Sequence, residues 1–205
     1  MERYSTIKQY GTFEYEDRKS VFIGEAMPVS CEADAIAFIE RVRKKYPDAR
    51  HHVYAYVLRE NNTSRFSDDH EPQGTAGMPV LDSIRKRGLT DCVCVVTRYF
   101  GGTLLGTGGL VRAYTAAAAG AITAGEVITY DIYTEMQITL EYSDYGKIGA
   151  ALDEFSFRCE DTDYAEKITL LGKIEKSKLD LFTEKLTEIT SARAGCEILG
   201  EKYDF

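Results

Sequence analysis

Five glycines fall within nine residues of this chain, between an apolar segment and an alanine-rich one. The apolar segment, residues 92–98, is rich in valine and predicts a buried strand, and residues 110–124 predict a helix. Glycine allows a positive φ and lets another group approach the backbone closely, at an entropic cost. Glycines concentrated between a strand and a helix indicate that the connection needs this conformational freedom. Because free N–H groups at a helix start attract anions, that connection is a candidate binding site.

The glycines do not match the common phosphate-binding motifs. A P-loop needs lysine after its second glycine, and Thr107 follows Gly106 here. The dinucleotide fingerprint needs a third glycine where Val111 stands. The sequence therefore predicts no nucleotide cofactor, and no other cofactor is implied.

A second polar segment, residues 68–77, precedes the strand and contains three carboxylates. Carboxylates this close could ligate a metal, but the spacing of a calcium loop is absent and we predict no metal site. We expect this segment to meet residues 98–114 in space, because the two carry opposite charges. Arg98 and Arg112 then have two interpretations. They bind phosphate while the neighbouring tyrosines, at positions 99 and 114, stack on bases, or they pair with the carboxylates and lock the loops. The candidate ligand-binding residues are Asp68, Asp69, Glu71, Gly74, Thr75, Arg98, Tyr99, Gly101, Gly102, Gly108, Gly109, Arg112 and Tyr114.

Two adjacent histidines begin the strand predicted over residues 51–58. Successive side chains of a strand point to opposite faces, so only one histidine can point at any one site. Zinc binding is therefore not predicted. His51 is a weak candidate for a catalytic base, and a hydrogen-bonded structural role is the alternative.

Further periodic segments predict the remaining elements. Ser30 is expected to cap a helix over residues 31–45 with Ala35, Ile36, Ile39 and Val42 on its apolar face. Ser143 and Ser177 are expected to begin two later helices. Strands are predicted at 18–26, 134–141, 157–164, 166–171 and 196–203, and a short helix at 79–86.

Charge is distributed unevenly along the 205 residues, whose net charge is −8. Residues 1–125 carry 16 Lys and Arg against 15 Asp and Glu, whereas residues 126–205 carry 9 against 18. Any contact with nucleic acid is therefore expected in the first part of the chain. No apolar run approaches membrane-spanning length, and the N-terminus has no apolar signal core, so we expect a cytoplasmic protein without membrane contact. The five scattered cysteines are expected to be reduced.

Longer motifs resemble a known family. Residues 68–79 and 98–114, with Arg18-Lys19-Ser20-x-Phe22-Ile23 and Ala49-x-His51, resemble signatures of the YigZ/Impact family. His70 and Gln73 depart from its usual glycine and serine. The resemblance implies a domain like ribosomal protein S5 domain 2, followed by a smaller one like elongation factor G domain V. It also implies a eukaryotic relative that regulates translation under amino-acid starvation.

These observations together predict an α+β protein of two domains, residues 1–128 and 132–205. The second should be ferredoxin-like, because its predicted order is β-α-β-β-α-β. We expect a translation-linked regulatory or stress-response protein that binds RNA, the ribosome or a protein partner through its first domain. The alternative is an enzyme that acts on a small phosphorylated substrate at the glycine-rich loop, and we favour the binding protein. It is expected to be a monomer or a weak homo-oligomer.

Overall fold

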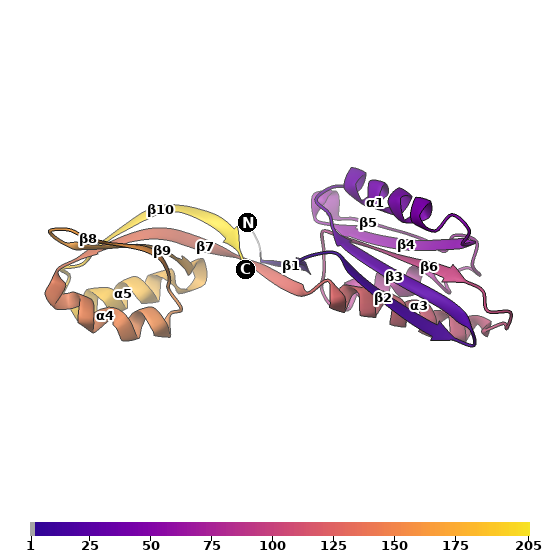
Figure 1. Ribbon diagram of the computed structural model, residues 1–205. Helices are drawn as coiled ribbons and strands as arrows, with labels where there is room; N and C mark the ends of the chain where they lie inside the picture. Colours follow the sequence, from indigo (N-terminus) through magenta and orange to yellow (C-terminus); the bar gives the residue numbers. More distant parts are fainter. Residues whose placement is uncertain (1–2) are drawn as a thin grey trace. The chain divides into compact units, whose positions relative to one another are not determined.

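The computed structural model describes residues 3–205, which form two compact units. One comprises Tyr4–Thr129, and Tyr130–Phe205 together with Arg3 belong to the other. The chain contains helices and two sheets, and the predicted α+β class is confirmed (Figure 1). In the described part of the chain, no helix is long and apolar enough to cross a membrane.

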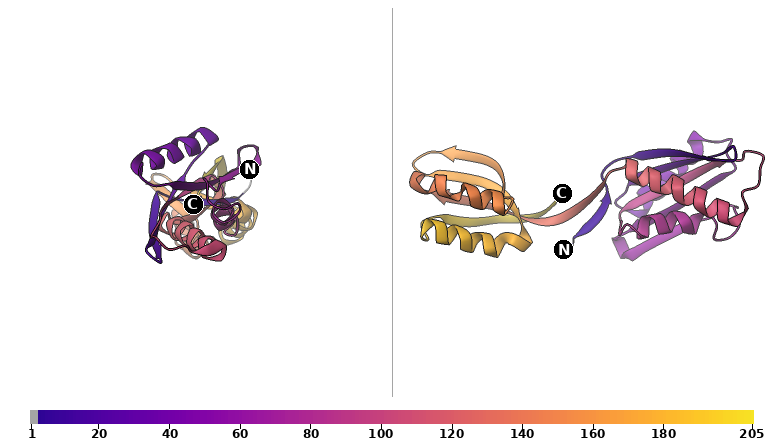
Figure 2. Two further views of the ribbon diagram at one scale, coloured as in Figure 1. Left: turned by 90° about the vertical axis from the view of Figure 1, so that its right-hand side faces the viewer. Right: turned by 90° about the horizontal axis from the view of Figure 1, so that it is seen from below.

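The N-terminal unit is built on a five-stranded sheet in which neighbouring strands are antiparallel. Helix α1 (Glu32–Lys45) covers one face of this sheet, and helices α2 (Gly77–Arg85) and α3 (Gly106–Ala124) cover the other (Figure 2). In spatial order the strands are β2 (Gly11–Asp17), β3 (Ser20–Pro28), β6 (Cys92–Tyr99), β4 (His51–Leu58) and β5 (Thr63–Ser67). The short strand β1 (Tyr4–Ile7) lies beside β7 (Val127–Leu140) instead, and a 3-10 turn (Glu60–Asn62) joins β4 to β5.

Strand β6 is buried on both faces, which explains its uninterrupted apolar sequence. Cys92, Cys94 and Val96 belong to the core under α2 and α3, whereas Val93 and Val95 belong to the core under α1. Burial raises the pKa of the Cys92 thiol to about 12. This thiol is therefore a small apolar side chain rather than a nucleophile.

Three predicted helix starts in this unit were wrong. Helix α2 begins at Gly77 rather than at residue 79. Cys31 precedes α1 as its cap residue, and Ser30 lies one residue earlier, where its Oγ donates to Asp34. Phe38 is buried in place of Ile36, whose side chain is half exposed. Helix α3 begins at Gly106 rather than at residue 110, so three of the five glycines form its first turn. The apolar face of the rest of α3 packs on the sheet, and this packing outweighs the low helix propensity of the glycines in the first turn.

The C-terminal unit has the ferredoxin-like order that was predicted (Figure 2). Its strands lie in the order β10-β7-β9-β8, and both helices cover the same face of the sheet. Neither Ser143 nor Ser177 caps a helix, because Glu141 and Lys178 occupy the cap positions. In chain order the elements are β7 (Val127–Leu140), α4 (Tyr142–Glu154), β8 (Arg158–Tyr164), β9 (Ile168–Glu175), a 3-10 turn (Lys176–Lys178), α5 (Leu179–Thr190) and β10 (Gly195–Asp204).

Candidate functional site

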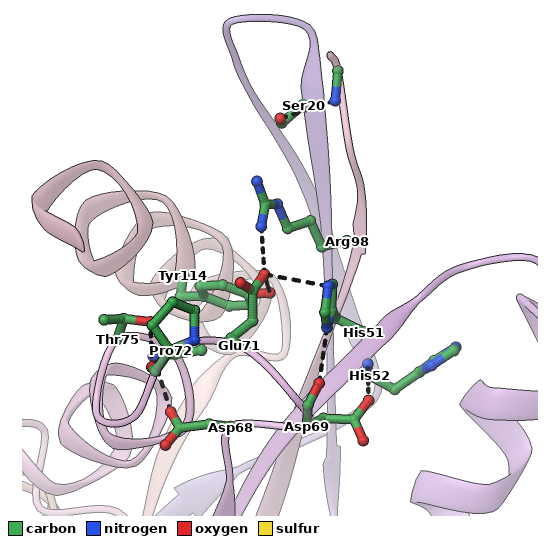
Figure 3. Close-up of polar contacts among 12 residues, drawn as sticks. Ser20, His51, His52, Asp68, Asp69, Glu71, Pro72, Thr75, Arg98 and Tyr114 are labelled. Carbon is green, nitrogen blue, oxygen red and sulfur yellow. Dashed lines mark hydrogen bonds and ion pairs between the residues drawn. The ribbon is translucent and has the colours of Figure 1, made fainter. Parts of the chain in front are cut away.

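Three neighbouring strands of the N-terminal unit place three side chains in one row. The register sets Phe22 of β3 and His51 of β4 on either side of Arg98 of β6. Phe22 belongs to the core under α2 and α3, so the row faces those helices. The loop between β5 and α2, which carries residues 68–76, passes over this row (Figure 3).

A buried ion pair joins that loop to the strand. Glu71 Oε1 accepts hydrogen bonds from Arg98 Nη1 at 2.5 Å and from the Tyr114 hydroxyl at 2.8 Å. Desolvation, followed by the neighbouring Glu71 carboxylate, raises the pKa of Tyr114 well above its usual range. The 68–77 loop and the 98–114 segment therefore meet, as their opposite charges predicted. In Arg98 one polar atom, Nε, is buried without a partner among the described residues.

Asp68 holds the same loop from within. Its carboxylate accepts the backbone N–H groups of Gly74, Ala76 and Gly77 at 2.8–3.1 Å. The Thr75 hydroxyl donates to the Pro72 carbonyl at 2.6 Å. Asp68 is therefore a turn-forming residue in this structure rather than a partner of an arginine.

The two histidines lie on opposite faces of the sheet, as predicted. His51 Nδ1 lies 2.8 Å from the Asp69 carbonyl oxygen, which can only accept, so Nδ1 carries the proton. The Asp69 carboxylate accepts the backbone N–H of His52 at 2.6 Å. His51 Nε2 then faces Glu71 Oε1 at 4.0 Å. This arrangement orients the ring, and a catalytic role for His51 remains an untested hypothesis.

The glycine-rich loop rests on the turn between β2 and β3. The backbone N–H of Gly101 donates to Ser20 Oγ at 3.0 Å, and a Cβ on Gly101 would lie 2.1 Å from the Lys19 carbonyl carbon. Arg18 Nη1 donates to the Leu104 carbonyl at 3.4 Å. The candidates derived from the sequence omitted residues 18–20, although the motif Arg18-Lys19-Ser20 was the available signal.

Of the remaining candidates, Gly102, Gly108 and Arg112 are exposed, Tyr99 is partly exposed, and Gly109 is buried. Arg112 is exposed, and its Nη1 would lie 3.6 Å from a Cβ on Gly108, beside the first turn of α3. That turn contains no acidic residue and has no side-chain cap. The Tyr99 hydroxyl donates to Asp48 at 2.9 Å. Phe100 is 52% exposed, and its ring lies 5.6 Å from the Arg98 guanidinium carbon. The locking interpretation thus holds for Arg98, while Arg112 has no ion pair in residues 3–205.

Comparisons with known proteins extend over both units. A family model described as Impact N-terminal domain matches residues 18–122, and one described as a domain of unknown function (DUF1949) matches residues 138–193. The chain is 36% identical over 192 residues to IMPACT family member YvyE of Bacillus subtilis (strain 168), covering 93% of this chain and 88% of the relative. It is also 36% identical to IMPACT family member YigZ of Escherichia coli (strain K12) over 178 residues, covering 85% and 87%.

A more distant relative and a solved structure are also similar to this chain. Protein IMPACT of Homo sapiens is 31% identical over 94 residues, which are 44% of this chain and 29% of that protein. A solved structure described as the crystal structure of an hypothetical protein superposes with a TM-score of 0.60 at 32% identity, covering 98% of both chains. The similarity to the bacterial relatives and to this structure therefore includes both units.

Proposed function

Because this chain belongs to the IMPACT family, we propose that it is a translation-linked regulatory protein that binds RNA through its N-terminal unit. The proposed contact surface is the loop cluster, which we define as residues 18–20, 100–105 and 106–112. The family resemblance supports the link to translation, since its eukaryotic member is implied to regulate translation. The surface chemistry supports RNA as the partner.

The observation that carries the proposal is the exposed Arg112 beside an uncapped helix start. Its guanidinium lies next to the first turn of α3, where backbone N–H groups and the helix dipole favour an anion. No carboxylate in the described chain forms an ion pair with Arg112. Arg18 and Lys19 add two exposed cations next to the same loop. Cations beside the N–H groups of a helix start suit a phosphate group.

Exposed apolar side chains accompany these cations. Phe100 is 52% exposed and Leu104 is 82% exposed, both within the loop cluster. Single-stranded RNA is commonly recognised by stacking unpaired bases on aromatic rings while basic residues follow the backbone. A partner that offers both phosphates and unstacked bases therefore suits this surface better than an inorganic anion.

The buried ion pair between the 68–76 loop and β6 suits a structural role better than catalysis. Glu71 already accepts from Arg98 and Tyr114 and is almost completely buried. A catalytic carboxylate needs access to its substrate, which Glu71 lacks. We therefore favour the binding protein, and binding of a small phosphorylated compound without RNA would favour the enzyme.

The test is RNA binding measured by fluorescence anisotropy, with an RNA hairpin that has single-stranded flanks, at several salt concentrations. Arg112→Ala should weaken binding and lower the salt slope by about 0.7–0.9, the loss of one phosphate contact. Arg65→Ala is the matched control, because Arg65 is an exposed arginine on β5, at the other edge of the sheet from β2. Equal effects of the two substitutions, or no binding by the unaltered protein, would contradict the proposal.

A further inference from the structure

A groove of about 230 Å³ lies between helices α2 and α3, which pack side by side on the sheet. Pro79 of α2 and Val111 and Ala119 of α3 supply its apolar walls. Between the last two residues the groove extends about 12 Å along α3, because an α-helix rises about 1.5 Å per residue. Val111 is 38% exposed and also belongs to the loop cluster. The groove is therefore continuous with the surface that we propose for RNA.

Two cations line the groove away from Arg112. The run Arg85-Lys86-Arg87 stands at the C-terminal end of α2, and its last two residues line the groove and are exposed. Arg87 Nη1 donates to Thr123 Oγ1 at 3.0 Å, near the end of α3, whereas Arg112 lies near the start of that helix. Neither Lys86 nor Arg87 forms an ion pair within residues 3–205. A strand that followed the groove would therefore meet positive charge at both of its ends.

The same groove contains one carboxylate, that of Asp82, between these cations. Asp82 lies one turn before Lys86 on α2 and is partly exposed. In the described part of the chain, no ion pair or side-chain hydrogen bond occupies its carboxylate. Such a group repels phosphate, but it accepts hydrogen bonds from N–H donors. The middle of the groove therefore suits a neutral group with a donor edge, whereas its ends suit anions.

We propose that this groove binds one base of the RNA strand whose phosphate contacts Arg112. The base lies against the apolar walls and donates a hydrogen bond to Asp82, and the next phosphate pairs with Lys86 and Arg87. A nucleic-acid strand alternates anions with neutral rings that carry donors, as the groove requires. An acidic peptide would instead bring its own carboxylates to Asp82. The inference rests on the RNA binding proposed for the loop cluster and adds a base preference to it.

Asp82 gives the groove a preference between the two pyrimidines. Cytosine carries an amino donor at N4, and carboxylates are a usual partner of that group. Uracil carries a carbonyl oxygen at the same position, and this acceptor would face the Asp82 oxygens. The two rings have the same size, so the apolar walls should bind both alike. The contact at Asp82 should therefore favour cytosine about tenfold.

The test is fluorescence anisotropy of the full chain with short oligocytidine and oligouridine RNAs of equal length. The unaltered chain should bind oligocytidine about tenfold more tightly than oligouridine. Asp82→Asn should bring this ratio close to one, because an amide can donate to uracil as well as accept from cytosine. The affinity for oligouridine should not fall in this variant, since a negative charge is removed. Equal binding of the two RNAs by the unaltered chain, or a ratio that persists in Asp82→Asn, would overturn the proposal.

Neighbouring cations supply a matched pair of variants for the phosphate contact. Lys86→Ala should weaken the binding of both RNAs and lower the salt slope by about 0.7, the loss of one single-strand phosphate contact. Arg85→Ala is the control, because Arg85 is exposed but does not line the groove, and its Nη2 donates to Ser64 Oγ at 2.8 Å. This control should change binding less than twofold. Equal effects of the two substitutions would overturn the groove contact.

Arg112→Ala separates this inference from the proposed function. If Arg112→Ala weakens RNA binding while Asp82→Asn and Lys86→Ala change nothing, the loop cluster binds RNA and the groove does not. If the unaltered chain binds neither RNA, the proposed function fails and the groove contact fails with it. A glutamate oligomer is the probe for the acidic-peptide alternative. Its displacement of oligocytidine at equal concentration would show that the surface recognises negative charge alone, and would overturn the base contact.

Discussion

Arg98 and Arg112 flank the same glycine-rich segment but have different roles in the structure. Arg98 is 6% exposed and lies near the end of β6 beneath the Glu71 loop, whereas Arg112 lies on the outer side of α3. The apolar residues Leu110, Ala113 and Tyr114 form one buried stripe of α3, and Arg112 is not part of that stripe. The helical pattern alone is therefore enough to predict that Arg112 is exposed. The burial of Arg98 depends on strand register and on a distant loop, which a local pattern does not encode.

Glu71→Gln should destabilise the N-terminal unit strongly. The substitution keeps the side-chain volume but leaves the Arg98 guanidinium buried without a counter-charge. We expect the free energy of unfolding to fall by about 3 kcal/mol. Urea denaturation followed by circular dichroism measures this change. The control is Glu14→Gln, because Glu14 is exposed on the edge strand β2.

The paired substitution tests the cause of that loss. Adding Arg98→Met to Glu71→Gln removes the unpaired charge and should restore part of the stability, giving a coupling energy of at least about 1 kcal/mol. Additive effects of the two substitutions would show that the ion pair is not the source of the loss.

At the scale of elements, the two central strands β4 and β6 of the N-terminal unit were predicted well, whereas the edge strands of the same sheet were missed. The range of β4 agrees with its prediction, and β6 extends one residue further, because both have strong apolar patterns. Strands β2 and β5 were not predicted. Both lie at sheet edges and expose much of their surface, so their polar side chains hide the strand period. Long-range pairing specifies such strands more than their own sequence does.

The close contact at Gly101 predicts that a larger residue at this position disturbs the loop cluster. Gly101→Ala would place a Cβ 2.1 Å from the Lys19 carbonyl carbon, so the loop or the β2–β3 turn must move. We expect a loss of about 1–3 kcal/mol in the free energy of unfolding, together with weaker RNA binding. Thermal and urea unfolding and the anisotropy assay measure the two effects.

Gly108→Ala is the matched control for this glycine. The nearest atom to its Cβ would be Arg112 Nη1 at 3.6 Å, an ordinary contact, and the position is helical. Stability should be unchanged or rise by up to about 1 kcal/mol. An equal or larger loss at Gly108 would contradict the packing argument for Gly101.

In the C-terminal unit, Asp144 connects the first turn of α4 to the segment after α5. Its carboxylate accepts from Arg193 Nε and Nη2 at 2.9 and 2.8 Å and from Lys147 Nζ at 2.7 Å. The Arg193 hydrogen bonds, followed by those of Lys147, lower the pKa of Asp144 to about 2. Carboxyl ¹³C NMR should find this value, and Arg193→Ala should raise it toward the ordinary value of about 3.9.

The lowered pKa of Asp144 determines how the stability of the C-terminal unit changes with pH. Between pH 4 and pH 2 the unfolded chain binds a proton at Asp144 that the folded chain does not bind. The stabilising contribution of Asp144 is therefore complete above about pH 4 and is lost as the pH falls toward 2. Asp144→Asn should remove this part of the acid dependence. Lys185→Ala should leave the pKa of Asp144 unchanged, because Lys185 of α5 pairs with Glu188 and not with Asp144.

At the scale of the molecule, each unit has a core made of its own residues. The clusters around Phe22 and Phe38 contain residues of the N-terminal unit, and the cluster around Phe182 contains residues of the C-terminal unit. The two-domain class could be predicted because the hydrophobic pattern and the charge balance both change along the chain. The partner could not be predicted, because it depends on which cations remain exposed after folding.

The difference in charge between the two units predicts how the C-terminal unit affects RNA affinity. Residues 126–205 carry 9 Lys and Arg against 18 Asp and Glu, so the C-terminal unit should repel phosphate. A fragment of residues 1–129 should therefore bind RNA more tightly than the full chain at about 0.01 M salt, where the Debye length is about 30 Å. The two affinities should converge near 0.5 M, where screening removes the long-range repulsion. Anisotropy measures both, after circular dichroism has established that the fragment is folded. A folded fragment that loses RNA binding would instead assign recognition to the acidic unit.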